Sequence, residues 1–348
     1  MKKFLQQMAT TPHVAGFETK LAKLIEPKFA TYTTVTIDKM GNLIAHKPGA
    51  KKTKNAPKVM VCAHMDEIGM MVTQLCDDGF VKFTRQGGID KRNILATEVT
   101  IHGKEPIYGV IGIKPPHLTS PDEMKKSIEI KDMAIDTGFS KEKLEKLIRV
   151  GDIITFNQEV KELKNGKLAG RALDDTAGIA AMFHAAKALK DFNHNADVYF
   201  VASAQEEVGC RGATTVAYDL KPDIAIIVDV GFANMPGLSE DKTIKMGDGP
   251  AIGIGPNINR KLFDDLKKVA KKHNTKHQIE VLPHMSGTDT EVIQITEGGV
   301  ITALLSIPLK YMHSTVETVD IADIKSCGKL IADYIMSLQD WNGEEEWF

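Results

Sequence analysis

The sequence predicts an α/β protein with a mixed sheet flanked by helices and a small β domain inserted into it. Two observations support this fold class. Toward both ends of the chain, short apolar runs alternate with segments of helical periodicity, which is typical of a sheet covered by helices on both faces. Between about residues 72 and 160, short alternating runs are instead separated by glycines, which is typical of an antiparallel β domain.

The length is consistent with two domains. The chain has 348 residues, and a domain takes roughly 150. We expect the α/β domain to consist of residues 1–70 and 164–348, with residues 71–163 forming the inserted β-rich domain.

The first part of the chain supplies the beginning of the α/β domain. Residues 1–28 have helical spacing, and residues 35–37 and 43–45 are expected to be strands around a turn. Residues 58–63 form a nearly continuous apolar run, which predicts a strand buried on both faces.

The inserted region alternates between polar and apolar residues. Expected strands lie at residues 80–84, 98–102, 108–113 and 152–156, and residues 114–133, rich in proline and charge, are expected to form a loop.

The α/β pattern then returns for the rest of the chain. Helices are expected at residues 174–189, 260–273 and 321–338, and strands at 197–204, 223–228, 278–282 and 300–307.

Composition excludes several classes of function. Lys and Arg total 44 against 46 for Asp and Glu, a net charge of −2 that offers no field for binding nucleic acid or an anionic membrane. The four cysteines form no CxxC pair, the first residues lack a continuous apolar segment, and no apolar run approaches the roughly 20 residues of a membrane span. We therefore expect a cytoplasmic protein whose near-neutral charge is compatible with self-association.

Acidic residues and histidines gather where the predicted strands end. They follow four strands and begin one helix: residues 64–67, 174–175, 206–207, 229 and 313. Because ligands of open α/β sheets bind beyond the carboxyl ends of the strands, these residues are expected to converge. Each one alone would be a turn, a cap or a solvated charge. Together, such carboxylates repel one another unless cations neutralise them.

The donor types predict two metal ions. Imidazoles and carboxylates without thiolates suit Zn, Co or Mn, and a two-metal site needs one shared carboxylate. Asp174 is the candidate bridge. His64 and Asp229 would complete the shell of one ion, and Glu207 and His313 that of the other.

Two further carboxylates are assigned to catalysis. Glu206 adjoins the ligand Glu207 but points the other way in an extended chain, so it is the candidate general base. Asp66 lies two residues from His64 and is expected to orient its imidazole.

At these residues the chain resembles the M42 family of metallopeptidases, the glutamyl and leucyl aminopeptidases. Six motifs match in family order: Ala63-His-Met-Asp-Glu-Ile-Gly69, Ala172-Leu-Asp-Asp175, Gln205-Glu-Glu-Val-Gly209, Val228-Asp-Val230, Gly287-Thr-Asp289 and Ser306-Ile-Pro-Leu-Lys-Tyr-Met-His-Ser314. The resemblance implies the fold of the dinuclear metallopeptidases, the same metal ligands and general base, two divalent ions (Zn or Co), and support of the first ligand by Asp66. It also implies that the insertion is a dimerisation domain and that dimers can build a twelve-subunit shell.

The expected activity is therefore metal-dependent removal of the N-terminal residue from peptides with a free N-terminus, by attack of a water that bridges two metals. The alternative is a related dinuclear hydrolase, a carboxypeptidase or N-acyl deacylase, which would need an arginine for the substrate carboxylate. Two weaker rivals are a non-enzymatic assembly or peptide-binding protein, and a nucleotide-binding enzyme suggested by Gly253-Ile-Gly255.

Overall fold

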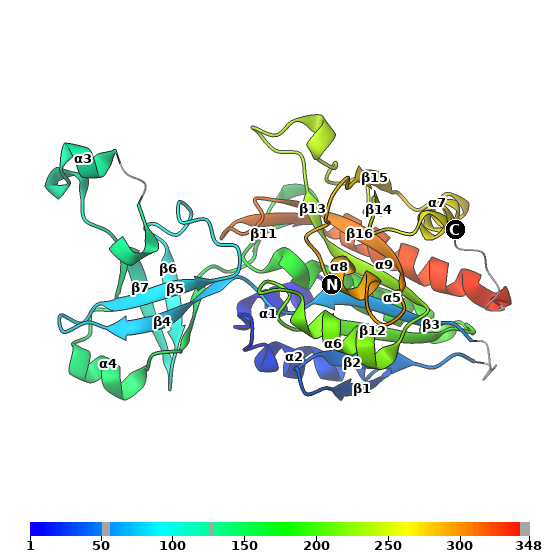
Figure 1. Ribbon diagram of the computed structural model, residues 1–348, viewed down its shortest axis with the longest axis horizontal. Coiled ribbons are helices and arrows are strands. Elements are labelled where there is room, and N and C mark those ends of the chain that lie inside the picture. Colours follow the sequence, from blue (N-terminus) through cyan, green and yellow to red (C-terminus); the bar gives the residue numbers. More distant parts are fainter. Residues whose placement is uncertain (51–55, 126–127, 342–348) are drawn as a thin grey trace.

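Two bodies of different architecture make up the molecule. The computed structural model describes residues 1–50, 56–125 and 128–341, and Figure 1 shows a small β body beside a larger α/β body. Each body has its own apolar core: one cluster of buried side chains lies between the large sheet and its helices, and a second lies inside the small body. The predicted fold class, α/β with a small β domain inserted, is confirmed.

A mixed sheet forms the centre of the larger body. Its main path runs β1-β2-β12-β3-β13-β16-β17-β11-β10, with β14 and β15 added beside β16. The strands are β1 (Thr34–Ile37), β2 (Leu43–Lys47), β3 (Lys58–His64), β10 (Lys161–Glu162), β11 (Lys167–Gly170), β12 (Asp197–Ser203), β13 (Ile224–Phe232), β14 (Ala251–Ile254), β15 (Gln278–Val281), β16 (Ile301–Lys310) and β17 (Glu317–Asp320). The four central strands, β12, β3, β13 and β16, are parallel to one another, so their carboxyl ends open on the same edge.

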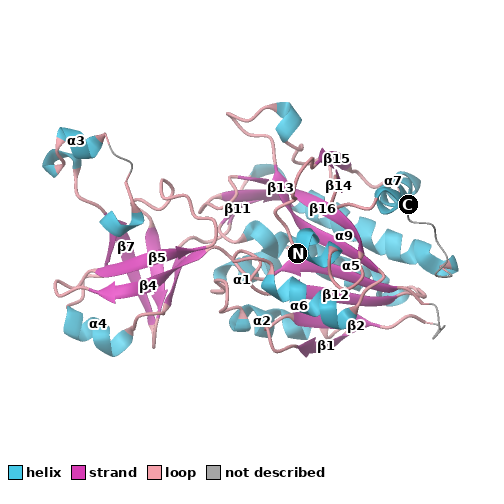
Figure 2. Cartoon of the chain, viewed as in Figure 1, coloured by secondary structure: helices cyan, strands magenta, loops and turns pink. Residues whose placement is uncertain are grey.

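Helices cover this sheet (Figures 1 and 2). They are α1 (Lys2–Thr10), α2 (Thr19–Phe29), α5 (Leu173–Ala188), α6 (Arg211–Leu220), α7 (Arg260–Lys272), α8 (Thr290–Gln294) and α9 (Ile321–Ser337). Helix α5 packs against β3, β13 and α9, whereas α6 packs against β12 and α8. As expected of a strand covered on both sides, β3 is buried at every residue after Lys58.

The small body is a closed barrel with strand order β4-β5-β8-β7-β6-β9. Its strands are β4 (Gly69–Leu75), β5 (Val81–Gln86), β6 (Glu98–His102), β7 (Pro106–Gly112), β8 (Ala134–Asp136) and β9 (Ile153–Phe156), and helix α4 (Lys141–Leu147) packs beside it. Strand β7 alternates strictly between exposed and buried residues, which is the periodicity of a sheet with one face on a core.

Several elements differ from the sequence prediction. Strands β13 and β16 run to Phe232 and Lys310, beyond the predicted ends, because their backbones stay paired with each other as far as Phe232 and Leu309. Asp229 therefore lies within β13 rather than at its end. The predicted loop 114–133 contains three short helical turns: η1 (Pro116–Leu118), α3 (Pro121–Met124) and η2 (Ile130–Asp132); its residues 126–127 lie outside the described part.

The ends of the chain agree with the helical patterns in the sequence. The predicted helical segment 1–28 is two helices, α1 and α2, and the closing helix is α9. Among the residues that the structure describes, no helix combines the length and the apolar character needed to cross a membrane.

Candidate active site

The carboxyl edge of the four parallel strands brings the predicted site residues together. His64 is the last residue of β3, Glu206 and Glu207 follow β12, Asp229 lies on β13, and His313 follows β16. Parallel pairing brings these residues to the same edge. In β3 and β12, His64 is paired with Ser203, so the residues that follow β12 lie beside the end of β3.

Asp174 completes the group from the first turn of α5. It is buried, is joined to Asp175 by a cis peptide bond, and enters the edge where β3 and β13 end. Its carboxylate lies between the two histidines. Oδ1 is 3.0 Å from His64 Nε2, and Oδ2 is 3.3 Å from His313 Nε2, whose ring also lies 3.2 Å from Glu207 Oε1.

The donor atoms fall into two overlapping groups. His64, Asp174 and Asp229 offer ligand atoms that all lie within 4.8 Å of one another, and the same holds for Asp174, Glu207 and His313. Asp174 belongs to both groups. These are the two sets that the sequence analysis assigned to separate ions with a shared carboxylate, and their role as metal ligands stays a prediction.

The raised pKa values of three acidic residues indicate that too little positive charge surrounds them. Burial raises the pKa of Asp229 well above its usual range, and the neighbouring carboxylate of Asp175 adds to the effect. Burial likewise raises the pKa of Glu207, and it raises that of Glu206 to about 8, with Asp289 and Glu207 contributing. Acidic groups that are this reluctant to ionise fit a site where divalent cations supply the missing charge.

The two histidines have the opposite shift. Burial opposes protonation, but the hydrogen bonds to Asp174 and Glu207 raise the pKa of His313 to about 11. The pKa of His64 is also raised despite burial, chiefly through Asp174 and then Asp66. Protons on the imidazoles thus occupy the positions that face the carboxylates. Imidazole nitrogens and carboxylate oxygens in this arrangement suit zinc or a similar divalent ion.

Asp66 contacts both His64 and the Glu206-Glu207 turn. His64 Nδ1 donates to the backbone carbonyl oxygen of Asp66 at 2.9 Å, whereas the Asp66 carboxylate lies 3.7 Å from the ring. The carboxylate instead accepts the backbone N–H groups of Glu206 and Glu207, at 2.8 and 3.0 Å. The residue therefore orients the imidazole with its main chain and fixes the Glu206-Glu207 turn with its side chain.

Sequence reasoning missed Glu317, which organises half of the site. This buried carboxylate on β17 accepts the backbone N–H groups of Leu173, Asp174 and His313. Burial raises its pKa well above the usual range. The available signal was a glutamate, four residues after His313, inside the β-branched run Thr315-Val-Glu-Thr-Val319.

The barrel also contributes to the site. The loop after β5 places the carbonyl oxygen of Gly88 3.1 Å from His313 Nδ1. A Cβ atom at Gly88 would lie 2.6 Å from that same nitrogen, so no larger residue fits without moving the ring. The sequence signal was the pair Gly87-Gly88, which sequence analysis treated only as a separator between strands.

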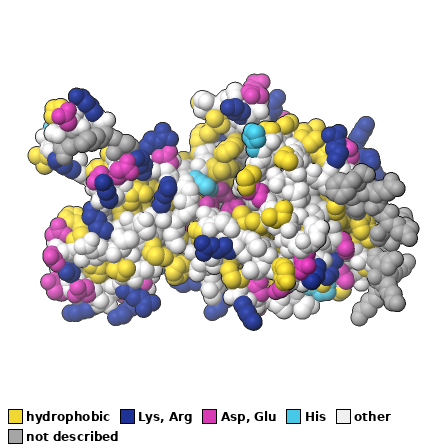
Figure 3. Space-filling model, in the orientation of Figure 1, with side chains coloured by type: hydrophobic (Ala, Val, Ile, Leu, Met, Phe, Trp, Pro, Cys, Tyr) yellow, Lys and Arg dark blue, Asp and Glu magenta, His cyan; other side chains and the backbone are white. Residues whose placement is uncertain are grey.

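The predicted ligands and Glu206 line a cavity of about 600 Å³. Figure 3 shows acidic and histidine side chains gathered in a hollow beside hydrophobic ones. The same cavity is lined by Phe232, Glu280, Leu282, Leu304 and Ser306. Among the described residues, none of those lining this cavity is a lysine or an arginine.

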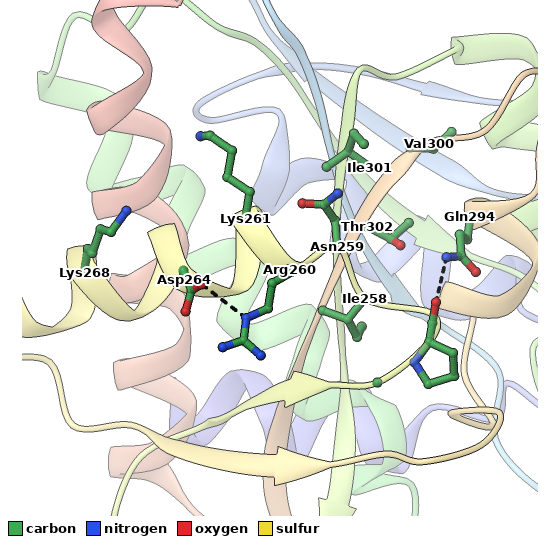
Figure 4. Close-up of a pocket in the computed structure, with 12 residues that line it drawn as sticks. Ile258, Asn259, Arg260, Lys261, Asp264, Lys268, Gln294, Val300, Ile301 and Thr302 are labelled. Atoms are coloured by element: carbon green, nitrogen blue, oxygen red, sulfur yellow. Dashed lines mark hydrogen bonds and ion pairs between the residues drawn. The ribbon is translucent and has the colours of Figure 1, made fainter. Parts of the chain in front are cut away.

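A second concavity of about 570 Å³ lies beside α7, on the stretch that contains Gly253-Ile-Gly255 (Figure 4). Its charged groups are already engaged: Arg260 pairs with Asp264 at 3.2 Å, and Lys261 and Lys268 pair with Asp265 at 2.7 and 3.1 Å. With these cations paired along α7, the concavity does not suggest a nucleotide site.

Known proteins resemble the chain over nearly its whole length. The lysyl aminopeptidase of Pyrococcus furiosus is 40% identical over 300 residues, which is 85% of each chain. An aminopeptidase from Desulfurococcus kamchatkensis has a similar structure, with a TM-score of 0.90, 33% identity, and coverage of 98% of this chain and 97% of that one. For the TET1 peptidase of Pyrococcus horikoshii the TM-score is 0.85, with 31% identity and coverage of 97% and 99%.

The sequence profile described as M42 glutamyl aminopeptidase matches residues 41–330. This range spans all the predicted ligands, the barrel and the wall of the cavity. Together with the relatives, it shows that the chain belongs to the M42 family and is a metal-dependent aminopeptidase, a hydrolase of N-terminal peptide bonds.

Proposed function

We propose that the chain removes N-terminal residues with two divalent ions held by His64, Asp174, Asp229, Glu207 and His313. The observation that carries this proposal is the Asp174 carboxylate, whose two oxygens face two different histidines at 3.0 and 3.3 Å. A carboxylate so placed is suited to being shared between two ions. Zinc or cobalt fits the nitrogen and oxygen donor set.

Bound ions of this kind act as Lewis acids on a carbonyl oxygen and lower the pKa of water to about 7. Glu206 would act as general base: it removes a proton from the attacking water and returns it to the departing amine. Asp66 fixes the turn from which Glu206 extends.

The same cavity favours a substrate with a free α-amine. Its acidic lining and the lack of lysine or arginine among the described lining residues suit an amine and leave no partner for a substrate carboxylate. This absence argues against the carboxypeptidase alternative. An N-acyl group would remove the amine's charge and lone pair.

The decisive experiment compares a free peptide with its N-acetylated copy in the presence of zinc or cobalt. We expect stepwise loss of N-terminal residues from the free peptide only. Losing a desolvated charged interaction of this kind costs about 2–5 kcal/mol, or roughly 30-fold to several thousand-fold in rate. Equal cleavage of the capped peptide, or loss of residues from the C-terminus, would reassign the chain to the alternative hydrolase class.

We also propose that residues 71–163 form a dimerisation domain. The barrel contributes no proposed metal ligand, and its strand β7 exposes Tyr108 and Val110, at 52% and 40% of their surface. The TET1 peptidase of Pyrococcus horikoshii can assemble into a tetrahedron or a large octahedral shell, which supports self-association of this chain, including a twelve-subunit particle. A cytoplasmic location fits its four unpaired cysteines.

Native mass spectrometry tests the assembly. The wild type should be an oligomer, and Tyr108→Glu with Val110→Glu should weaken it by placing charges on the contact surface. The paired change Lys143→Glu with Lys146→Glu, on the exposed face of α4, is the matched control. A wild-type monomer at micromolar concentration would contradict the proposal.

A further inference from the structure

The cavity beside the metal-site residues is also lined by the carboxylate of Glu280 on β15. Strand β15 pairs with β14, which pairs with β16, and the Glu280 side chain accepts a hydrogen bond from the hydroxyl of Ser306 on β16. Ser306 is the register partner of Asp229 on β13. The serine that holds Glu280 thus lies about one strand spacing, roughly 4.8 Å, from the residue position that carries a proposed ligand.

Only one oxygen of Glu280 has a hydrogen-bond partner among the residues that the structure describes. Ser306 donates to Oε2, whereas Oε1 lies beside Gly231, 3.1 Å from the position that a Cβ atom would take there. Within residues 1–50, 56–125 and 128–341, no lysine, arginine or histidine forms an ion pair with Glu280. The carboxylate is therefore held in place by one neutral partner and has no counter-ion of its own.

The surroundings of Glu280 in the cavity are apolar. Leu282, Leu304 and Phe232 line the same cavity, and Gly231 packs closely beside the carboxylate, where a Cβ atom would come within 3.1 Å of Glu280 Oε1. An aliphatic stem can pack on such a wall while its end reaches the carboxylate. A substrate side chain that combines methylene groups with a terminal cation matches both features.

We propose that Glu280, held by Ser306, recognises the side chain of the substrate's N-terminal residue and selects lysine or arginine. This assignment rests on the proposed function, because it takes the N-terminal residue to be bound with its scissile bond at the Asp174 site. Glu280 would contact the substrate side chain and take no part in proton transfer.

Other N-terminal residues fit this wall less well. Aspartate or glutamate would bring a second negative charge against Glu280. Leucine would fill the apolar part but cover a carboxylate without pairing it, which is costly in a desolvated position. Burial already raises the pKa of Glu280, so the group gains from a cation nearby.

The first test uses the wild-type protein with metal and peptides that differ only in the first residue. We expect kcat/KM for lysine or arginine to exceed that for leucine by roughly 30-fold, the effect of a well-placed charged pair, and to exceed that for glutamate by more. A peptide that begins with Nε-acetyl-lysine is the matched control, since it keeps the stem and removes the charge. Equal rates for lysine and Nε-acetyl-lysine would overturn the inference.

The second test changes the protein. Glu280→Gln keeps the size and the acceptor for Ser306, and it should reduce the lysine-to-leucine ratio of kcat/KM by roughly 30-fold. Glu291→Gln is the control, because Glu291 lines the same cavity while its carboxylate binds the backbone N–H of Gly287. That variant should keep the ratio within about threefold. A ratio that Glu280→Gln leaves unchanged would contradict the proposal.

The proposed function and the role of Glu280 would be rejected by different results. If no free peptide loses its first residue, the proposed function fails. If leucine or alanine peptides are cleaved but lysine and arginine peptides have no advantage, the function stands and the role of Glu280 is rejected. Ratios within one protein preparation are independent of how much of the protein is active, so a poorly folded variant cannot imitate either result.

Discussion

The carboxyl edge of the sheet and the barrel contrast in how their residues are brought together. At the sheet edge, His64 and His313 are 249 positions apart in sequence, yet both contact one aspartate. The barrel is built from strands within residues 69–156, and its buried side chains alternate with exposed ones. The comparison shows that charged side chains are buried at the sheet edge, where they form the candidate active site, while the core of the barrel is apolar.

The two regions meet at the site. The Gly88 carbonyl from the inserted region accepts a hydrogen bond from His313 Nδ1 and so orients a proposed metal ligand of the α/β body. The difference between the two regions can be tested by substitutions in each of them. Changes at the sheet edge should affect chemistry and metal binding, and changes inside the barrel should affect stability.

Asp174→Asn should have the largest effect. The substitution removes the negative charge that faces both histidines, so we expect loss of both ions and of detectable activity. Metal analysis after dialysis, together with peptide hydrolysis, measures both. Asp175→Asn is the control for a change in the same turn. A variant that keeps two ions would show that another carboxylate is shared.

Glu206→Gln should separate catalysis from metal binding. Because this carboxylate is assigned to proton transfer, the variant should keep its ions but lose about 10²–10⁴-fold in kcat. Metal content and single-substrate kinetics test it. Near-normal turnover would reject the role of general base.

The sequence was sufficient for the fold class and for the convergence of the site, because both depend on local patterns. The apolar run of β3 and the acidic residues after β12 are visible in the chain itself. The predicted end of β13 was wrong, because the burial of the residues past Asp229 depends on the neighbouring strands. Closure of the barrel depends on the three-residue strand β8, which is too short to have a periodicity of its own.

Supporting contacts were the least predictable part of the site. Glu317 binds three backbone N–H groups that belong to two distant segments, and nothing in its local sequence indicates either of them. The same holds for Asp289, which accepts the hydroxyl of Ser203 at 2.6 Å beneath the site. Such roles require knowledge of which backbone groups the fold leaves without partners.

Glu317→Gln should have an intermediate effect on metal affinity and activity. An amide replaces one acceptor oxygen with a donor, so at least one of the N–H groups that position Asp174 and His313 loses its partner. Loss of such a supporting contact typically lowers metal affinity or activity by about 10–100-fold. Competition with a chelator measures the affinity. An unchanged affinity would show that the ligands hold their positions without it.

The smallest effect is expected in the barrel, from His102. This histidine on β6 lies 2.9 Å from the hydroxyl of Thr155 on β9. Burial lowers its pKa to about 4, and the charges of Lys20 and Arg171 act in the same direction, against the opposing effect of Glu67. The folded protein therefore keeps His102 neutral at a pH where the unfolded chain, with a histidine pKa near 6.5, already binds a proton.

The sign of the pH dependence follows. Between about pH 6.5 and pH 4 the unfolded state binds more protons at this position, so the free energy of unfolding falls as the pH falls. Above pH 6.5, His102 does not make the free energy of unfolding depend on pH.

The expected size of the effect is modest. Because His102 is only partly buried, we expect it to lower the free energy of unfolding by about 1 kcal/mol over this window once solvent screening is allowed for. His102→Gln should remove that loss, whereas His117→Gln, in the exposed turn η1 between β7 and β8, should leave it in place. Urea unfolding of the three proteins from pH 4.5 to 7.5 gives the comparison, and taking differences between proteins cancels the contribution of the histidines at the sheet edge. Parallel curves for the wild type and His102→Gln would show that His102 titrates in the folded barrel as it does in the unfolded chain.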